Sequence, residues 1–409
     1  MGVYVHVPYC QTRCGYCDFN TFVPGESGRG QPSDWARSAS AEIELRSREL
    51  GPFTGPVDTV FFGGGTPTLL PAKDLGMVLE QIAAVWGIAS DAEITTEANP
   101  ETIEPGMLKQ LLAVGFNRLS IGMQSADQAV LRTLDRSHTP GGSVTAAHLA
   151  HMAGFAHISL DLIYGTPGET LSSWEGSIEA ALAAPVDHTS AYGLKVESGT
   201  RLARRIRRGE VPAVNDDYAA DAYQLADQMF ADAGLHWYEI SNWARPGGKC
   251  HHNLGYWQGA DWLGIGPGAH GTTRGLRYWN EKLPARWAAR IAEGLLPTAG
   301  TEHLTPDERL TETVMLSIRL STGLRLLEVG LAPQDPMVRG LVDQGLAERS
   351  TPTSIRLTRS GRLLADMVTL RLLERLDALA ADSGHRASQF ASPDCNPHPN
   401  ALPGTTATA

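Results

Sequence analysis

The chain has 409 residues, of which 42% are hydrophobic and 19% are charged, so it has the composition of an ordinary soluble globular protein and not of a disordered chain. Asp and Glu number 45 against 34 Lys and Arg, which leaves a formal net charge of -11 and no basic footprint for nucleic acid or an anionic membrane. No apolar run is long enough to span a membrane, and no secretory signal is recognisable. We therefore expect a cytoplasmic protein with no nucleic-acid partner and no membrane segment.

The first 270 residues alternate β-rich runs with helical patterns. Parallel strands need crossover connections, which are usually helices, so this alternation predicts an α/β fold with a parallel sheet. Six such units are fewer than the eight of a closed barrel, and we expect a partial (β/α)6 barrel. The expected strands are Val3–Val7, Val57–Phe62, Glu93–Glu97, Asn117–Gly122, Ile158–Ile163 and Thr189–Val196, with His236–Ile240 and the run Leu263–Gly268 beyond them. The expected helices include Lys73–Trp86, Gly106–Val114 and Ser143–Ala153.

Polar or glycine-rich segments recur at the ends of the expected strands. Cys10–Cys17 follow the first strand and Gly63–Pro67 follow the second. Because the active site of a β/α barrel is built at the carboxyl ends of its strands, we expect these segments and the later strand ends to meet in one site. The later strand ends carry Glu97, Gln124, Asp161 and Tyr192.

The cysteines give the most specific chemical signal. Three of the five, Cys10, Cys14 and Cys17, are closely spaced, whereas Cys250 lies far from them, and this does not indicate a disulfide framework. Thiolates are the usual ligands of iron–sulfur clusters, and three thiolates on a four-iron cluster leave one iron free for another ligand. The spacing therefore predicts a cluster site. A zinc knuckle completed by His6 is the alternative.

The glycine run Gly63–Pro67 would let a ligand approach the backbone closely, because glycine has no side chain in the way. It is not a P-loop, since no Gly-Lys-Ser/Thr follows, and a simple tight turn is the alternative. Glu97 could accept hydrogen bonds from ribose hydroxyls, although a lone carboxylate is more often a solvated loop residue. Gln124, Arg136 and Asp161 give no specific signal individually.

In combination, these segments resemble a known family. The three-cysteine spacing, Gly-Gly-Thr-Pro at 64–67, Glu-Ala-Asn-Pro at 97–100 and Asp161–Gly165 are similar to the motifs of radical S-adenosylmethionine (SAM) proteins. More narrowly, residues 2–380 resemble the family of oxygen-independent coproporphyrinogen III oxidase and its heme-chaperone relatives. The resemblance implies a [4Fe-4S] cluster whose unique iron binds the amino and carboxylate groups of SAM. Reductive cleavage of SAM then gives a 5′-deoxyadenosyl radical, and the protein positions the cofactor that supplies this chemistry.

The resemblance also implies roles for individual residues. Cys10, Cys14 and Cys17 would hold the cluster, with Tyr16 packed beside it, and an electron donor would have to reduce it. Gly193 and His270 match the family less closely. The residues that would line SAM are Tyr4, Gly64, Gly65, Thr66, Glu97, Gln124, Arg136 and Asp161.

Two departures separate the chain from the oxidase and match the heme-chaperone branch. The oxidase has a further cysteine where this chain has Phe19, and it has an extension before the first strand, which here begins at residue 2. The loop 250–257, Cys-His-His-Asn-Leu-Gly-Tyr-Trp, resembles the His-Asn-x-x-Tyr-Trp motif of that branch. The resemblance implies heme binding by this loop and delivery of heme to an acceptor protein. Because the loop follows a strand candidate, we expect it near the mouth of the cluster site. His252 is the leading axial ligand, with Cys250 and His251 as the other candidates.

Other interpretations stay open at this stage. The loop 250–257 could be a core-packing aromatic loop with no ligand. For the whole chain, the alternatives are the oxidase activity, which converts coproporphyrinogen III to protoporphyrinogen IX, and a zinc-stabilised binding protein. The arginines of Arg201–Arg208 predict a solvated helix face, with contact to heme propionates or to an acidic partner as the alternative.

The composition changes near residue 300, so we expect a barrel domain over residues 1–300 and a smaller unit over 301–382. Residues 383–409, which include Cys395, have the composition of a disordered tail. The smaller unit has the order of a winged-helix module but no basic face, which favours a lid or a docking role over DNA binding. Its expected elements are a helix that starts at the capping box of Thr305 and Glu308 and runs through Arg319, a helix near Pro336–Gln344, a hairpin over Leu346–Leu357 and a final helix from Arg359 to Ala381.

Overall fold

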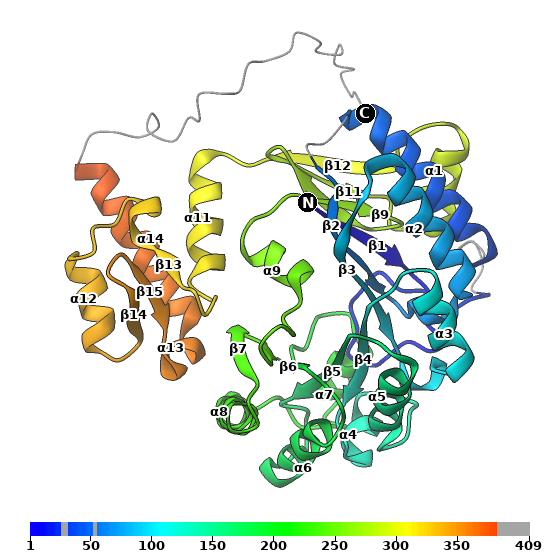
Figure 1. The fold of residues 1–409 in the computed structure, drawn as a ribbon. Helices are drawn as coiled ribbons and strands as arrows, with labels where there is room; N and C mark the ends of the chain where they lie inside the picture. The colour runs from blue at the N-terminus through cyan, green and yellow to red at the C-terminus, as the bar shows by residue number, and fades with distance from the viewer. Residues whose placement is uncertain (26–31, 52–54, 383–409) are drawn as a thin grey trace.

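The structure is a computed structural model that describes residues 1–25, 32–51 and 55–382. Within these ranges the chain forms a sheet of 12 strands and a separate sheet of three strands, with helices around both (Figure 1). The strands of the large sheet are β1 (Gly2–Val7), β2 (Val57–Gly64), β3 (Ile88–Ala98), β4 (Arg118–Gln124), β5 (His157–Tyr164), β6 (His188–Gly193), β7 (His236–Glu239), β8 (Asn242–Ala244), β9 (Trp262–Ile265), β10 (His270–Thr273), β11 (Leu276–Asn280) and β12 (Thr298–His303). Those of the small sheet are β13 (Leu324–Arg325), β14 (Ala347–Thr351) and β15 (Ser354–Leu357).

Helices connect the strands throughout the chain. The helices of the first 300 residues are α1 (Pro32–Leu50), α2 (Ala72–Trp86), α3 (Pro105–Ala113), α4 (Gln128–Thr133), α5 (Gly142–Ala153), α6 (Leu171–Leu182), α7 (Arg201–Arg207), α8 (Asp216–Asp232), α9 (His251–Trp257) and α10 (Pro284–Ala292), with the short 3-10 turns η1 (Pro67–Leu69) and η2 (Pro100–Thr102). The later helices are α11 (Pro306–Ser317), η3 (Leu326–Val329), α12 (Pro336–Asp343), α13 (Arg359–Leu363) and α14 (Ala365–Asp382).

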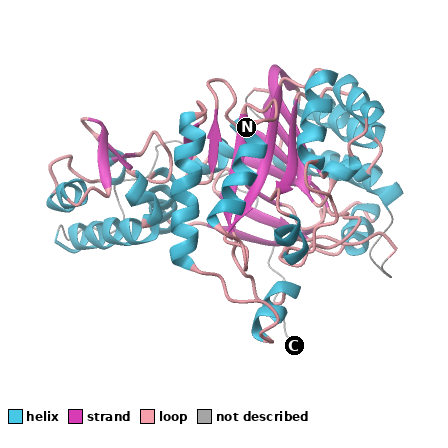
Figure 2. Ribbon diagram, turned by 90° about the horizontal axis from the view of Figure 1, so that it is seen from below, coloured by secondary structure: helices cyan, strands magenta, loops and turns pink. Residues whose placement is uncertain are grey.

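The centre of the large sheet is the predicted parallel unit. Strands β1 to β6 pair in chain order and all run parallel, and a helix lies in each connection between them. On its other edge β1 pairs in parallel with β9. The sheet is curved, with helices along its outer side (Figure 2). The prediction of an open α/β barrel with six βα units is confirmed.

Of the strands at the edges of this sheet, only β7 was predicted from the sequence, as His236–Ile240. Antiparallel strands β10, β11 and β12 extend it beyond β9, and β8 and β7 extend it beyond β6. These strands have three to six residues, and their partners lie in hairpins or across the sheet, so single-strand hydrophobic patterns give little signal for them.

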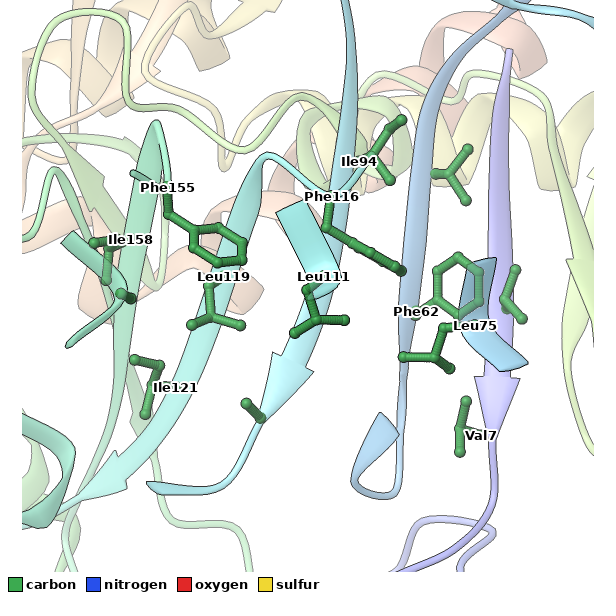
Figure 3. Close-up of a cluster of buried hydrophobic side chains, with 14 of the residues drawn as sticks. Val7, Phe62, Leu75, Ile94, Leu111, Phe116, Leu119, Ile121, Phe155 and Ile158 are labelled. Atoms are coloured by element: carbon green, nitrogen blue, oxygen red, sulfur yellow. The ribbon is translucent and has the colours of Figure 1, made fainter. Parts of the chain in front are cut away.

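The outer face of the parallel strands forms the main hydrophobic core (Figure 3). Successive side chains of a strand point to opposite faces, and in β4 the fully buried Leu119 and Ile121 both point outward to the helices. Leu75 of α2 packs into the same core. Phe62 of β2 and Phe116 meet edge to face, with ring centroids 5.1 Å apart. Burial of this face against the helices fixes the register of each strand, and with it the side chains on the inner face.

The alternate residues of the same strands point to the inner face, and most of them are polar. Examples are Tyr4 and His6 of β1, Thr95 and Glu97 of β3 and Asp161 of β5. Buried polar groups need hydrogen-bond partners or a ligand. The inner face is therefore where this fold can carry chemistry.

A second hydrophobic core lies in the C-terminal part of the chain, with Leu324, Ile355 and Leu372 among its buried residues. Helix α11 begins at the predicted capping box: the Thr305 hydroxyl accepts from the Glu308 N–H, and the Glu308 carboxylate accepts from the Thr305 N–H. Strands β14 and β15 form the predicted hairpin, and β13 adds a third strand. Figure 1 shows this unit beside α11, on the side of the molecule where α8 and α9 lie.

The predicted final helix Arg359–Ala381 is wrong in one respect, because it is two helices, α13 and α14, divided at Leu364. Helix α13 is attached to α8, because its residues Arg359 and Arg362 both donate to the buried Asp227 of that helix. Burial opposes ionisation of Asp227, but the hydrogen bonds and charge of Arg362 outweigh it and lower the pKa of this carboxyl.

Two further expectations from the sequence concern membrane segments and the C-terminal tail. Among the described residues, no helix combines the length and the apolar character that crossing a bilayer requires. The expected tail 383–409, with Cys395, lies outside the described residues.

Candidate cofactor-binding site

The three closely spaced cysteines lie on the loop that follows β1, at the carboxyl end of the parallel strands. Cys10, Cys14 and Cys17 are half-buried free thiols. The Gly15 N–H donates to the Leu134 carbonyl at 3.1 Å, which holds the loop against the end of α4. Burial raises the pKa of the Cys10 thiol to about 11, so a bound metal group is what would keep it ionised.

A chain of hydrogen bonds joins two of these thiols through the other sequence motifs. The Arg136 guanidinium donates to Cys14 Sγ at 3.3 Å and to Asn99 Oδ1 at 2.8 Å. The Asn99 amide donates to Thr66 Oγ1 at 3.0 Å. The Thr66 hydroxyl in turn lies 3.9 Å from Cys10 Sγ. The cysteine loop, the glycine run and the Glu-Ala-Asn-Pro segment, which were predicted to meet, therefore form one connected site.

Glycine is required at positions 64 and 65 because the backbone there lies very close to His6 and Tyr9 of the neighbouring segment. Gly64 has a φ of 103°, in the region that favours glycine, and a Cβ there would lie 2.2 Å from the His6 ring. A Cβ on Gly65 would lie 2.5 Å from the Tyr9 carbonyl oxygen. The Gly64 N–H donates to Glu97 Oε2 at 2.9 Å. The run is thus more than a simple turn, because it brings the β2 end against the cysteine loop and against Glu97.

Two carboxyl groups lie on the inner face below this turn. Burial raises the pKa of Glu97 to about 7, with a smaller contribution from the nearby charge of Asp161. Asp161 accepts hydrogen bonds from the hydroxyls of Ser120 at 2.7 Å, Ser190 at 2.6 Å and Ser159 at 3.3 Å. Burial nevertheless raises its pKa as well. The Glu97 carboxyl group therefore gains or loses its proton near pH 7. The Asp161 carboxyl group is held in position by the hydrogen bonds from the three serines.

Gln124 supplies the clearest sign that a ligand belongs here. It ends β4 with a φ of 57°, a backbone conformation that residues other than glycine rarely adopt. Its Oε1 is buried and accepts no hydrogen bond from the described residues. A Cβ on Gly122 would lie 2.8 Å from Gln124 Nε2 and 3.4 Å from the Arg136 guanidinium. Strain and an orphaned polar atom beside a glycine fit a polar ligand seated on this edge of the sheet.

The remaining predicted residues, Tyr16, Gly193 and His270, lie on three different elements. Tyr16, on the cysteine loop, is close to Cys14 and Arg136, and burial raises its pKa. Gly193 ends β6, where a Cβ would lie 3.2 Å from the Tyr164 hydroxyl. His270 is exposed at the start of the antiparallel β10.

The zinc alternative depended on His6, and the structure gives both ring nitrogens of this residue other partners. Nδ1 lies 2.9 Å from the Tyr4 hydroxyl, and Nε2 lies 3.0 Å from the Asn20 carbonyl oxygen. Within the part of the chain that the structure describes, no three His, Cys, Asp or Glu side chains form a group that could hold a single metal ion. His6 and Tyr4 instead line the inner face below the glycine run.

The predicted loop 250–257 is wrong in conformation and in position. Residues His251–Trp257 form helix α9, and His252 is buried against the amino-terminal half of β2, with its Nδ1 2.8 Å from Thr59 Oγ1. Thr59 lies five residues before Gly64, which is about 16 Å along a strand. His252 therefore lies deep on the inner face and not at the mouth of the cysteine site, whereas Tyr256 of the same helix is close enough to Tyr4 and Glu97 to interact with them electrostatically.

One residue that connects the parts of this site was not singled out in the sequence. Asn99 was quoted only as part of a motif, yet it is the link between Arg136 and Thr66. Its spacing gave the available signal, because Glu97 and Asn99 are two residues apart at a strand end and extend to the same side.

Comparison with known proteins agrees with this arrangement. A family model described as the radical SAM superfamily matches residues 4–181, which include most of β1, the cysteine loop and strands β2 to β5. The chain is 49% identical over 372 residues to the heme chaperone HemW of Mycobacterium tuberculosis, covering 91% of this chain and 94% of that one. The chain belongs to the HemW family of radical SAM proteins. The family also includes the heme chaperone HemW of Bacillus subtilis, which is 34% identical over 90% of this chain and 97% of its own.

The chain is also similar to a mitochondrial protein and to the solved structure of an oxidase. The chain is 34% identical to the mitochondrial radical S-adenosyl methionine domain-containing protein 1 of Bos taurus, over 92% of this chain and 88% of that one. Coproporphyrinogen III oxidase (HemN) of Escherichia coli has the same fold, with a TM-score of 0.76 over 90% of this chain and 89% of the other. At 23% sequence identity this similarity shows the fold alone.

Proposed function

We propose that this protein is a heme chaperone that binds heme and delivers it to an acceptor protein in the cytoplasm. The observation that supports this proposal most strongly is the similarity to HemW heme chaperones over nearly the full length of both chains. Phe19, in place of the further cysteine of the oxidase, and the His252 motif favour the chaperone over the oxidase.

The carboxyl end of the strands is the proposed site of a [4Fe-4S] cluster and SAM. Cys10, Cys14 and Cys17 would hold the cluster, which would supply one-electron reduction of bound SAM. Thr66 and Arg136 would donate hydrogen bonds to the cysteine sulfurs, as they do in the structure.

The residues that would bind SAM supply groups for each of its parts. Gly64 and Gly65 would contact the amino-acid end of SAM, and Glu97 can accept hydrogen bonds from the ribose hydroxyls. The amide of Gln124 has a free acceptor for a ligand N–H or O–H. Tyr4 and Asp161 lie further down the inner face and would close the site below.

Heme is the proposed ligand of α9, with His252 as the axial ligand. Its pKa is lowered to about 3 by burial, so the imidazole is neutral, the form that coordinates iron. Nε2 of His252 now lies 2.9 Å from the Tyr256 hydroxyl, and ligation requires that this hydrogen bond opens. His251 is the exposed alternative. Cys250 is less suited, because its buried thiol donates to Glu93 and burial raises its pKa to about 12.

Heme titration of single variants tests this assignment. We expect His252→Ala to lower heme affinity and change the Soret spectrum while iron and sulfide content stays at the wild-type level. His251→Ala should have a smaller effect, and Cys250→Ala tests thiolate ligation directly. If all three variants bind heme as tightly as the wild type, α9 is not the heme site. Loss of cluster iron in Cys14→Ala, with heme binding retained, would show that the two sites are separate.

A further inference from the structure

The turn that follows α4 contacts the cysteine loop with three consecutive residues. The Leu134 carbonyl accepts from the Gly15 N–H at 3.1 Å, and the Arg136 guanidinium donates to Cys14 Sγ at 3.3 Å. Asp135 comes between them in the sequence, and its carboxylate lies against the Cα of Gly15, where a Cβ would collide with Oδ2. Arg136 has a role in the proposed site, whereas Asp135 has none so far.

Asp135 is held in a conformation and an environment that do not favour a carboxylate. Its φ is 54°, in the left-handed region that glycine usually occupies at the end of a helix. The carboxyl end of a helix also disfavours negative charge. Oδ2 is buried and accepts no hydrogen bond from the described residues. Unfavourable arrangements of this kind persist only where the surrounding structure imposes them, and they concentrate at functional sites.

A second helix holds the cysteine loop against this carboxylate. The Leu202 N–H of α7 donates to the Gly15 carbonyl at 2.8 Å. Helix α7 is in turn attached to the end of α4, because Arg205 donates to the Thr133 carbonyl at 2.9 Å. Gly15 directly follows Cys14 in the sequence. The carboxylate is therefore packed on the residue next to a proposed cluster ligand.

The guanidinium of Arg201 neutralises this charge only in part. Arg201 is the first residue of α7, and its Nη1 lies 3.5 Å from Asp135 Oδ2. The Arg201 side chain is 65% exposed, whereas that of Asp135 is 22% exposed. Solvent screens the charge of Arg201, while Oδ2 is buried against the loop. A net negative charge therefore remains beside the loop.

We propose that Asp135 fixes a negative charge beside the cysteine loop and thereby lowers the reduction potential of the bound cluster, an inference that rests on the proposed cluster site. Reduction adds one electron to a cluster, and a nearby carboxylate in a region of low dielectric constant opposes the added negative charge. A cluster of lower potential is a stronger one-electron donor, which is the property that reductive cleavage of SAM requires. Arg136, on the same turn, has the opposite charge and acts in the opposite sense.

A redox titration of the reconstituted protein without SAM measures this effect. Dithionite supplies the electrons, and electron paramagnetic resonance quantifies the reduced cluster at each potential. The test variant is Asp135→Asn, because asparagine keeps the shape of the side chain and tolerates a φ of 54° but carries no charge. At the potential where half of the wild-type clusters are reduced, we expect about tenfold more reduced than oxidised cluster in Asp135→Asn, which is a rise of about 59 mV for a one-electron couple.

Two further variants separate this charge from a general change of charge. The matched control is Glu210→Gln, which changes the net charge equally at an exposed carboxylate beyond the other end of α7 and should leave the potential at the wild-type value. Arg201→Gln removes the partner of Asp135 and should lower the potential, by less because its side chain is mostly exposed. Iron and sulfide analysis ensures that the variants are compared at equal cluster content.

An unchanged potential in Asp135→Asn at full iron content, or an equal rise in Glu210→Gln, would overturn the role of Asp135. If Asp135→Asn lost its iron, Arg201→Gln would decide, and an unchanged potential in that variant would overturn the role as well. A wild-type protein that holds no iron after reconstitution would refute the proposed cluster site itself, and the inference with it.

Discussion

Arg136 shows how single residues couple the parts of the site. Its guanidinium contacts a sulfur of the cysteine loop on one side and the amide of Asn99 on the other, so it links the proposed cluster loop to the proposed SAM site. A charge-assisted N–H donor stabilises negative charge on sulfur. Glu97, on the opposite side of the glycine run, is held by the Gly64 N–H alone among the hydrogen bonds of the described residues. The site therefore has one fixed cation and one carboxyl group whose charge depends on pH.

The pH dependence of Glu97 gives a stability prediction. Burial raises its pKa from the ordinary value of 4.5 to about 7, so the folded protein binds this proton more tightly than the unfolded chain does. The contribution of Glu97 to the free energy of unfolding is therefore fully present below pH 4.5 and is lost as the pH rises to about 7. We expect Glu97→Gln to remove this loss, which makes the variant more stable relative to wild type at pH 8 than at pH 5, by up to about 3 kcal/mol.

Urea unfolding of both proteins at pH 5 and pH 8 measures this difference. Glu169, whose pKa is also raised to about 7 by burial, titrates in both proteins and cancels in the comparison. A stability difference between Glu97→Gln and wild type that is the same at both pH values would show that Glu97 ionises normally.

At the scale of elements, helix α9 is a case where tertiary contacts decide the conformation. It has seven residues, contains Gly255, and its N-cap residue Cys250 makes no side-chain capping bond. Its first N–H groups are instead satisfied by Glu93 of β3, which accepts from the amides of His251 at 3.0 Å and His252 at 2.9 Å. The Glu93 carboxylate, which is distant in the sequence, thus caps the amino terminus of α9 in place of a side chain at the N-cap position.

Removal of this carboxylate should unfold α9 first and cost much stability. Glu93 also lies 3.6 Å from the buried Arg118, and Glu93→Ala would leave that guanidinium without its acidic partner. We expect a loss of about 3–5 kcal/mol in the free energy of unfolding. The matched control is Glu348→Ala, which breaks the half-exposed pair with Arg356 and should change the urea midpoint little. Similar midpoints for the two variants would contradict the role of Glu93.

The same contacts explain what could be predicted from the sequence. The strands β1 to β6 were found because local hydrophobic runs reflect burial against helices, and the proposed cluster ligands were found because the three cysteines are close together in the sequence. Helix α9 was predicted as a loop because its cap comes from Glu93, 159 residues earlier than His252. Its distance from the cysteines depends on which end of β2 it contacts, and no local pattern carries that information.

At the scale of the whole molecule, one buried ionic cluster joins the C-terminal unit to the barrel. Asp227 of α8 accepts from Arg359 and Arg362 of α13 and from the Trp243 indole at 2.9 Å. The Arg362 guanidinium also stacks on the ring of Trp237, 4.4 Å from its centroid. A backbone hydrogen bond from Ser321 to the Tyr238 carbonyl adds a second point of attachment.

Asp227→Asn tests how much of this attachment is ionic. The variant keeps the shape of the side chain but leaves the buried Arg362 without a charged partner, so we expect a loss of about 3–5 kcal/mol. Because the pKa of Asp227 is lowered, its contribution is present above pH 3.8 and is lost as the pH falls below that value. Limited proteolysis should show earlier cleavage between the two units in Asp227→Asn than in wild type. Unchanged cleavage and stability would mean that the ionic cluster around Asp227 contributes little to holding the units together.

The most direct test of the whole account is a parallel anaerobic incubation of the reconstituted, SAM-loaded and reduced protein with heme and with coproporphyrinogen III. Porphyrin products and bound heme are then separated by chromatography and quantified. We predict stoichiometric, saturable binding of heme and no appreciable decarboxylation of coproporphyrinogen III. Formation of protoporphyrinogen IX in at least stoichiometric amounts, without saturable heme binding, would contradict the chaperone function and identify the protein as an oxidase.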